Sequence, residues 1–178
     1  MLRIKSSFVA LIVMFCLCCT GVAVCSAEDE IAKEFIDKPV PAISLKDIDG
    51  NVTDIASYKG KAVLINFWGL RCGSCIDEMP HLNKLYDDYK DKGLVILGVN
   101  ADGIDGEFLK GPRGMTNLPL ELKYTIIEDI EMTLIDTFKM EAAPLNILID
   151  KEGIVKFYHM GYEPGDEKKL EAAVKASL

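Results

Sequence analysis

Two apolar runs with a helix-like segment between them constrain the fold of this chain most strongly. Residues 62–68 form an apolar run that is typical of a strand buried on both faces, and residues 94–99 form a second one. Between the runs, apolar residues recur at the three- and four-residue spacing of one helix face: Ile76, Met79, Leu82, Leu85, Tyr86 and Tyr89. A strand, a helix and a strand in this order predict two parallel strands joined by a right-handed crossover.

The rest of the chain predicts further strands and helices around this unit. Residues 40–60 alternate apolar and polar positions about the turn Asp49-Gly50-Asn51, which predicts a β-hairpin. The remaining expected elements are a helical turn at 107–110, a strand at 125–127, a helix at 130–140, a hairpin of 145–150 with 154–160, and a helix at 164–177. We therefore expect an α/β fold, with a central mixed β-sheet flanked by helices and an N-terminal β-hairpin extension.

The N-terminal 27 residues predict export from the cytoplasm. Arg3 and Lys5 precede the apolar residues 8–24, and the small residues of Cys25-Ser26-Ala27 suit cleavage by a signal peptidase. A retained membrane anchor and a lipid-anchored Cys25 are the alternatives. All three place a single domain, residues 28–178, outside the cytoplasm, either free of the membrane or attached to it only through the N-terminus.

Only one pair of cysteines lies outside this export segment. Four of the six cysteines lie within residues 1–27, which leaves Cys72 and Cys75. The remaining 151 residues are enough for a proper core without disulfides, so the pair is expected to be chemical, and a C-x-x-C pair can cycle between dithiol and disulfide. Residues 28–178 also carry 18 Lys and Arg against 28 Asp and Glu, a net charge of −10 that opposes binding to nucleic acid and to anionic membranes.

Several motifs resemble those of a known family. The residues Asn66-Phe67-Trp68, the pair Cys72-x-x-Cys75, Pro80 and the segment Ala143-Pro144-x-x-x-Leu148-Ile149-Asp150 resemble the exported thioredoxin-like proteins of the TlpA/ResA type. The resemblance implies a thioredoxin-like fold and thiol–disulfide exchange without a cofactor. It also implies that the partners are exported proteins, for example apocytochromes c during cytochrome c maturation, and a membrane electron donor that recycles the thiols.

The chemistry is expected from Cys72, Cys75 and Glu78. If a helix begins at or just after Cys72, its N-terminus stabilises the thiolate and lowers the pKa of this cysteine, which makes Cys72 the expected nucleophile. Cys75, one turn away, would resolve the mixed disulfide. Glu78 matches a glutamate that is implicated in tuning the thiol pKa values of ResA-like members, and it could relay a proton. The alternative is an exposed acid in the first turns of a helix.

Four further residues are expected to bind the substrate. The resemblance implies that Pro144 has a cis peptide bond and that the backbone of Ala143 pairs with a substrate chain. Trp68 either shapes the docking surface beside the thiols or belongs only to the core. Arg71 makes the rim of the site more positive, and Ser74 replaces the proline that is common between such cysteines, which we expect to shift the redox potential.

Other functions remain open on the sequence alone. The protein could donate or isomerise disulfides, or it could be a non-catalytic module that binds a metal or a partner. A metal site could use Cys72, Cys75, His81 and His159, although their spacing fits no standard zinc finger, and we expect no metal. The residues before Cys72 lack the proline-and-threonine pattern that peroxiredoxins use, which disfavours a peroxidase.

Overall fold

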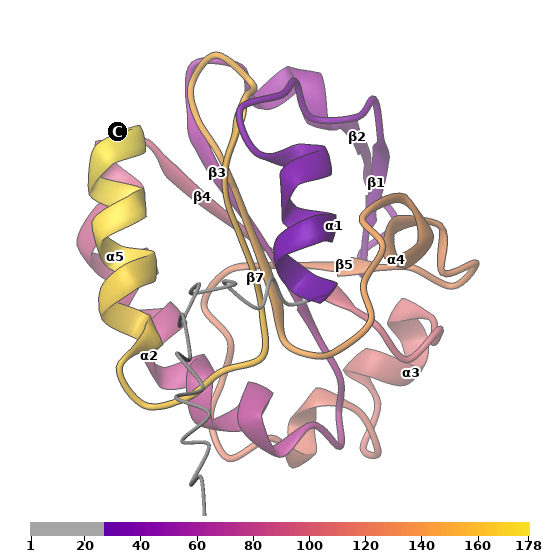
Figure 1. Cartoon of the computed structure of the whole chain (residues 1–178). Helices are drawn as coiled ribbons and strands as arrows, with labels where there is room; N and C mark the ends of the chain where they lie inside the picture. The colour runs from indigo at the N-terminus through magenta and orange to yellow at the C-terminus, as the bar shows by residue number, and fades with distance from the viewer. Residues whose placement is uncertain (1–26) are drawn as a thin grey trace, which may run out of the picture.

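The computed structural model describes residues 27–178, which form a seven-stranded sheet with helices on both faces (Figure 1). The helices are α1 (Ala27–Phe35), α2 (Gly73–Tyr89), α3 (Gly106–Lys110), α4 (Thr133–Thr137) and α5 (Asp166–Ser177). The strands are β1 (Ser44–Asp47), β2 (Val52–Asp54), β3 (Ala62–Trp68), β4 (Leu94–Asn100), β5 (Thr125–Glu128), β6 (Leu145–Ile149) and β7 (Val155–Met160). The predicted export segment lies outside the described residues, apart from its last one. From residue 27 onward, no helix has the length and apolar character needed to cross a bilayer.

The strand order β2-β1-β5-β4-β3-β6-β7 confirms the expected mixed sheet. β3 runs parallel to β4, and β4 runs parallel to β5, so the crossover through α2 connects parallel neighbours as predicted. The other pairings are antiparallel, including the hairpins β1–β2 and β6–β7. The β1–β2 hairpin extends the sheet at one edge by pairing with β5.

The side chains of β3 point alternately into two separate cores. Val63, Ile65 and Phe67 belong to a core that also contains Phe35 at the end of α1 and residues of and beside α4. Leu64 and Trp68 point to the other face and belong to a second core with α2 and α5, which lie close together (Figure 1). This alternation follows from the two-residue period of a strand, and it turns Asn66 toward α2.

The structure differs from the sequence-based expectation at two helices. The helix predicted at 130–140 is only the short α4, because Met132 has a left-handed backbone conformation (φ 55°) and the carboxylate of Asp129 accepts hydrogen bonds from the backbone N–H groups of Leu134 and Ile135. Such capping starts a helix late and fixes its first turn. Helix α1 was not predicted; it contacts β7, and the ring of its last residue, Phe35, stacks against Tyr158 with centroids 5.4 Å apart.

Candidate active site

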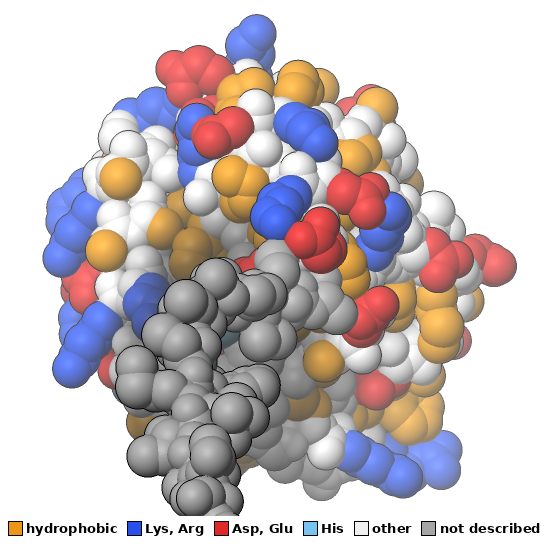
Figure 2. All heavy atoms as spheres, in the orientation of Figure 1, with side chains coloured by type: hydrophobic (Ala, Val, Ile, Leu, Met, Phe, Trp, Pro, Cys, Tyr) orange, Lys and Arg blue, Asp and Glu red, His pale blue; other side chains and the backbone are white. Residues whose placement is uncertain are grey.

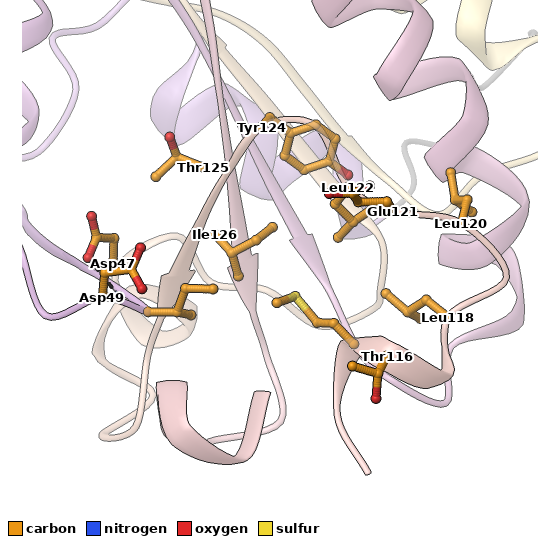
Figure 3. Close-up of a pocket in the computed structure, with 12 residues that line it drawn as sticks. Asp47, Asp49, Thr116, Leu118, Leu120, Glu121, Leu122, Tyr124, Thr125 and Ile126 are labelled. Carbon is orange, nitrogen blue, oxygen red and sulfur yellow. Dashed lines mark hydrogen bonds between the residues drawn. The ribbon is translucent and has the colours of Figure 1, made fainter. Parts of the chain in front are cut away.

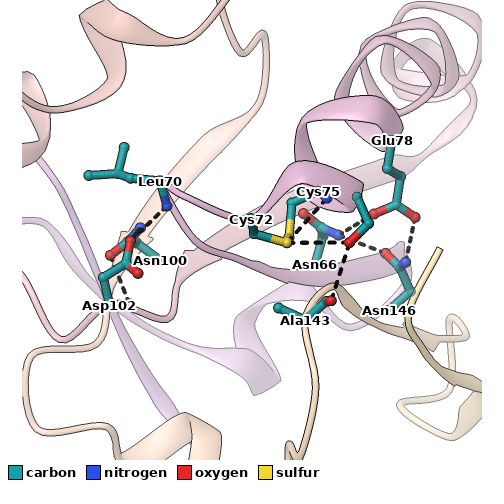
Figure 4. The surroundings of a disulfide bond; sticks show 10 residues. Asn66, Leu70, Cys72, Cys75, Glu78, Asn100, Asp102, Ala143 and Asn146 are labelled. Carbon is teal, nitrogen blue, oxygen red and sulfur yellow. Dashed lines mark hydrogen bonds between the residues drawn. A yellow bond between two sulfur atoms is a disulfide. The ribbon is translucent and has the colours of Figure 1, made fainter.

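The two cysteines form a disulfide at the N-terminus of α2, directly after the loop that follows β3 (Figure 4). Cys72 is the N-cap residue of the helix, and its sulfur accepts a hydrogen bond from the backbone N–H of Cys75 at 3.2 Å. Cys72 is partly exposed, whereas Cys75 is only 1% exposed. A partner can therefore reach the sulfur of Cys72 first, which supports its predicted role as nucleophile.

Glu78 lies one turn after Cys75 on the same buried face of α2, and its carboxyl group is held between two asparagines (Figure 4). The Nδ2 of Asn146 donates to one carboxyl oxygen at 2.6 Å, and the Nδ2 of Asn66 donates to the other at 3.0 Å. Asn66 Nδ2 also donates to Asn146 Oδ1 at 2.9 Å. The expected alternative, an exposed acid, is wrong: Glu78 is 4% exposed.

The register of the sheet brings these three residues together. Asn66 on β3 and Asn146 on β6 are direct antiparallel partners, so their side chains emerge side by side on the same face. That face is the one covered by α2, where Glu78 shares the buried helix face of Cys75 and Met79. Neither asparagine was predicted as a site residue. In the sequence, Asn66 appears only as part of the motif Asn66-Phe67-Trp68 that carries the family resemblance.

Burial sets the charge state of Glu78. Removal from water raises the pKa of its carboxyl group to about 7, although the hydrogen bonds from Asn146 and Asn66 favour the charged form and act in the opposite direction. Nearby His159 lowers this pKa and nearby Asp166 raises it, but both effects are smaller than burial. A carboxyl group with a pKa near 7 can give and take a proton at neutral pH.

The Ala143–Pro144 peptide bond is cis, as the resemblance implies, and Ala143 lies beside the disulfide (Figure 4). The hydroxyl of Ser74, between the two cysteines, donates to the carbonyl oxygen of Ala143 at 3.5 Å. Arg71 is exposed on the rim of the site. Trp68 is fully buried in the core beside α2, so the structure favours its core role and removes it from the docking surface.

Asp102, in the loop after β4, holds the loop that precedes the cysteines. Its Oδ2 accepts hydrogen bonds from the backbone N–H of Leu70 at 2.8 Å and from the side chain of Asn100 at 3.0 Å (Figure 4). A Cβ atom at Gly69 would lie 3.0 Å from the Asp102 carboxylate, so the close approach favours glycine there. Nothing local in the sequence signals this contact, because it joins residues 32 positions apart.

A surface groove of about 600 Å³ lies between the β1–β2 hairpin and the segment before β5 (Figure 3). Its lining includes Asp47, Leu118, Tyr124 and Ile126, and none of the predicted site residues. On the face shown in Figure 2, acidic and basic side chains are interspersed. The groove therefore shares no residue with the predicted site.

The structure does not bring Cys72, Cys75, His81 and His159 together as a metal site. Within residues 27–178, no group of three or more His, Cys, Asp or Glu side chains is arranged to hold a metal ion. The ring nitrogens of His159 instead lie 3.0 Å from a carboxylate oxygen of Glu28 and 3.3 Å from one of Asp166. His159 thus connects α1 to the start of α5.

The raised pKa of Glu78 predicts a specific pH dependence of stability. At a pH between 4.5, the ordinary pKa of a glutamate, and about 7, the carboxyl group of Glu78 is protonated in the folded protein and ionised in the unfolded chain. The contribution of the protonated Glu78 to the free energy of unfolding is therefore fully present below pH 4.5. It is lost as the pH rises through 7, which lowers the free energy of unfolding by up to about 3 kcal/mol. Urea unfolding of the oxidised protein and its Glu78→Gln variant between pH 4.5 and 8 measures this difference.

The matched control is Glu107→Gln, because the side chain of Glu107 is 92% exposed. The difference in free energy of unfolding between the Glu107→Gln variant and the parent protein should stay constant across this pH range. A constant difference between the parent protein and Glu78→Gln would contradict the raised pKa.

Comparisons with known proteins agree with this geometry. Residues 36–158 match the model of the AhpC/TSA family. The chain is 35% identical to the thiol-disulfide oxidoreductase ResA of Bacillus thuringiensis subsp. konkukian over 123 residues, which cover 67% of this chain and 66% of that protein. It is 35% identical to ResA of Bacillus anthracis over 140 residues, which cover 79% and 77% of the two chains.

A solved structure shows the same fold. The structure from Chlorobium tepidum that is provisionally assigned as the thiol:disulfide interchange protein DsbE superposes with a TM-score of 0.71 at 27% identity. The superposition covers 80% of this chain and 96% of that one. Together with the motifs around the disulfide, these matches show that the chain belongs to the AhpC/TSA family and, within it, to the thioredoxin-like proteins of the TlpA/ResA type.

Proposed function

We propose that this protein is an extracytoplasmic thiol–disulfide oxidoreductase that reduces disulfides of exported proteins. The observation that carries the proposal is the Cys72–Cys75 disulfide at the N-terminus of α2, with one sulfur reachable and the buried carboxyl of Glu78 one turn behind the other. The names of its ResA relatives support this activity. The N-terminal residues 1–27 support the location, since they read as a signal or anchor.

The reaction begins from the reduced protein with the thiolate of Cys72. This thiolate attacks one sulfur of the partner disulfide, so that a Cys72–partner bond forms and the partner S–S bond breaks. The departing partner sulfur leaves as a thiolate and takes a proton from water. The backbone N–H of Cys75, which already lies 3.2 Å from the sulfur of Cys72, stabilises the attacking thiolate at the helix N-terminus.

Resolution requires a second thiolate on the buried side. Cys75 loses its proton to the Glu78 carboxylate and attacks the sulfur of Cys72, which forms the internal disulfide and releases the second partner sulfur as a thiolate. Two electrons have then moved from the cysteine pair to the partner. Asn66 and Asn146 hold the carboxyl group in place during this transfer. Because Cys75 is buried, a nearby base is more valuable to it than to Cys72.

The rim of the site supports a protein substrate. The backbone of Ala143 lies beside Cys72 and can pair with an extended partner chain, and the exposed Arg71 can contact the same chain. We propose apocytochromes c awaiting haem as one class of partner, and a membrane electron donor that returns the internal disulfide to the dithiol. No cofactor takes part in these steps.

A trapping experiment tests the exchange mechanism. In Cys75→Ser the resolving thiol is absent, so Cys72 should retain its natural partner as a mixed disulfide, which mass spectrometry of exported proteins from the producing cell can identify. The control is the double variant Cys72→Ser, Cys75→Ser. Recovery of no partner above that control would argue against the exchange mechanism.

The proposed base predicts a defect confined to the second step. We expect Glu78→Gln to slow the release of a model thiol from its mixed disulfide with Cys72 by about 100-fold near pH 7. Single-turnover kinetics with the intact cysteine pair measures this rate. Asp77→Asn is the matched control, because Asp77 precedes Glu78 on α2 and is exposed. Equal rates in the parent protein and Glu78→Gln would remove Glu78 from the mechanism.

The direction of electron flow has its own test. A reductant should hold a reduction potential well below about −120 mV, the value of a strongly oxidising disulfide-forming enzyme. Equilibration of the Cys72–Cys75 pair with defined mixtures of reduced and oxidised glutathione gives this potential. A value close to about −120 mV would instead favour disulfide donation, and stoichiometric metal in protein purified without added metal would favour a metal-binding module.

A further inference from the structure

The hydroxyl group of Ser74 lies between two acceptors that belong to different parts of the site. Its oxygen is 3.6 Å from the sulfur of Cys72 and 3.5 Å from the carbonyl oxygen of Ala143. A disulfide sulfur carries no hydrogen, so the hydroxyl is the donor toward both atoms. Both contacts are long, and the single hydroxyl proton is shared between them in the oxidised protein.

We propose that Ser74 donates a hydrogen bond to the Cys72 thiolate in the reduced protein and thereby frees the Ala143 carbonyl for the partner chain. This proposal rests on the thiol–disulfide exchange proposed above. Reduction places a negative charge on one of the two acceptors, and hydrogen bonds to a charged acceptor are roughly twice as strong as those between neutral groups. Because a serine hydroxyl rotates freely, its proton follows that charge to the sulfur.

The thiolate would then have two donors instead of one. The backbone N–H of Cys75 already lies 3.2 Å from the sulfur of Cys72, and the Ser74 hydroxyl adds a second donor from the first turn of the same helix. The proline that is common at this position of related proteins has neither a backbone N–H nor a side-chain donor. Ser74 therefore lowers the pKa of the Cys72 thiol through a bond that a proline cannot make.

Reduction of the disulfide also makes the Ala143 carbonyl available as a hydrogen-bond acceptor for a partner chain. A partner that pairs in an extended conformation offers a backbone N–H to that carbonyl, which is the acceptor that the Ser74 hydroxyl occupies in the oxidised protein. When Cys72 forms the mixed disulfide, its negative charge passes to the departing partner sulfur. The Ser74 hydroxyl keeps its proton throughout and returns to the carbonyl once the partner leaves.

The test uses the pH dependence of alkylation of Cys72 in a Cys75→Ala background, because alanine adds no second hydroxyl beside the sulfur. Adding Ser74→Ala should raise the pKa of Cys72 by about one unit, which leaves about tenfold less thiolate well below that pKa. Ser74→Thr keeps the hydroxyl and should restore most of the shift. Arg71, Asp77 and Glu78, the charged and titratable groups nearest the pair in the chain, are the same in every variant.

The control is Ser57→Ala, because Ser57 is exposed and lies before β3, at the opposite end of that strand from the cysteines. It should leave the alkylation profile unchanged. With the cysteine pair intact, Ser74→Ala should also change the equilibrium constant with glutathione about tenfold, a potential about 30 mV more negative than that of the parent. An unchanged pKa of Cys72 in the Ser74→Ala variant would overturn the proposal.

The outcome also separates this proposal from the function on which it rests. Reduction of a model disulfide by the parent protein tests the exchange itself. If the parent reduces it and Ser74→Ala leaves the Cys72 pKa unmoved, only the role of Ser74 fails. If the parent fails to reduce any disulfide, the exchange proposal fails whatever the alkylation of Cys72 shows. The proposed release of the Ala143 carbonyl by Ser74 then fails with it.

Discussion

The hydrogen bonds of the Glu78 carboxyl group to Asn66 and Asn146 are the interaction on which the site depends. They join α2 to two neighbouring strands of the sheet, β3 and β6, at the buried side of the cysteine pair. A carboxyl group without partners at 4% exposure would be costly, whereas this one has a donor for each oxygen. The arrangement keeps a titratable group in the core and holds its pKa near neutral pH.

The position at which α2 begins explains why we propose different roles for the two sulfurs. The helix starts immediately after Cys72, so that this residue is at the exposed end, where backbone N–H groups point outward, while Cys75 is covered by the core one turn later. The first sulfur thus lies beside the backbone N–H of Cys75, which can stabilise a thiolate, and the second lies one turn from Glu78, which accepts its proton in the mechanism that we propose. One helix end therefore presents a partly exposed sulfur and a buried one, which suits the nucleophile and the resolving thiol of the proposed mechanism.

Much of this fold could be predicted because its signals are local or periodic. The buried strands at 62–68 and 94–99, the helix between them and the hairpin about Asp49-Gly50-Asn51 all appear at the expected places. The helix expected at 130–140 failed because the cap from Asp129 and the left-handed Met132 override the apolar spacing. The contact between Asp102 and the loop at Leu70 could not be predicted, since nothing in either segment indicates the other.

The sequence by itself determined the chemistry that this protein can perform, because a C-x-x-C pair at a predicted helix start needs only neighbouring residues to be recognised. Only the tertiary structure decided how that chemistry is tuned. Asn66 and Asn146 are 80 residues apart and meet because β3 and β6 pair in one register, and Glu78 loses its water because α2 packs over them. The pKa of a carboxyl group depends on burial and on such partners, which are properties of the packed molecule and not of the local sequence.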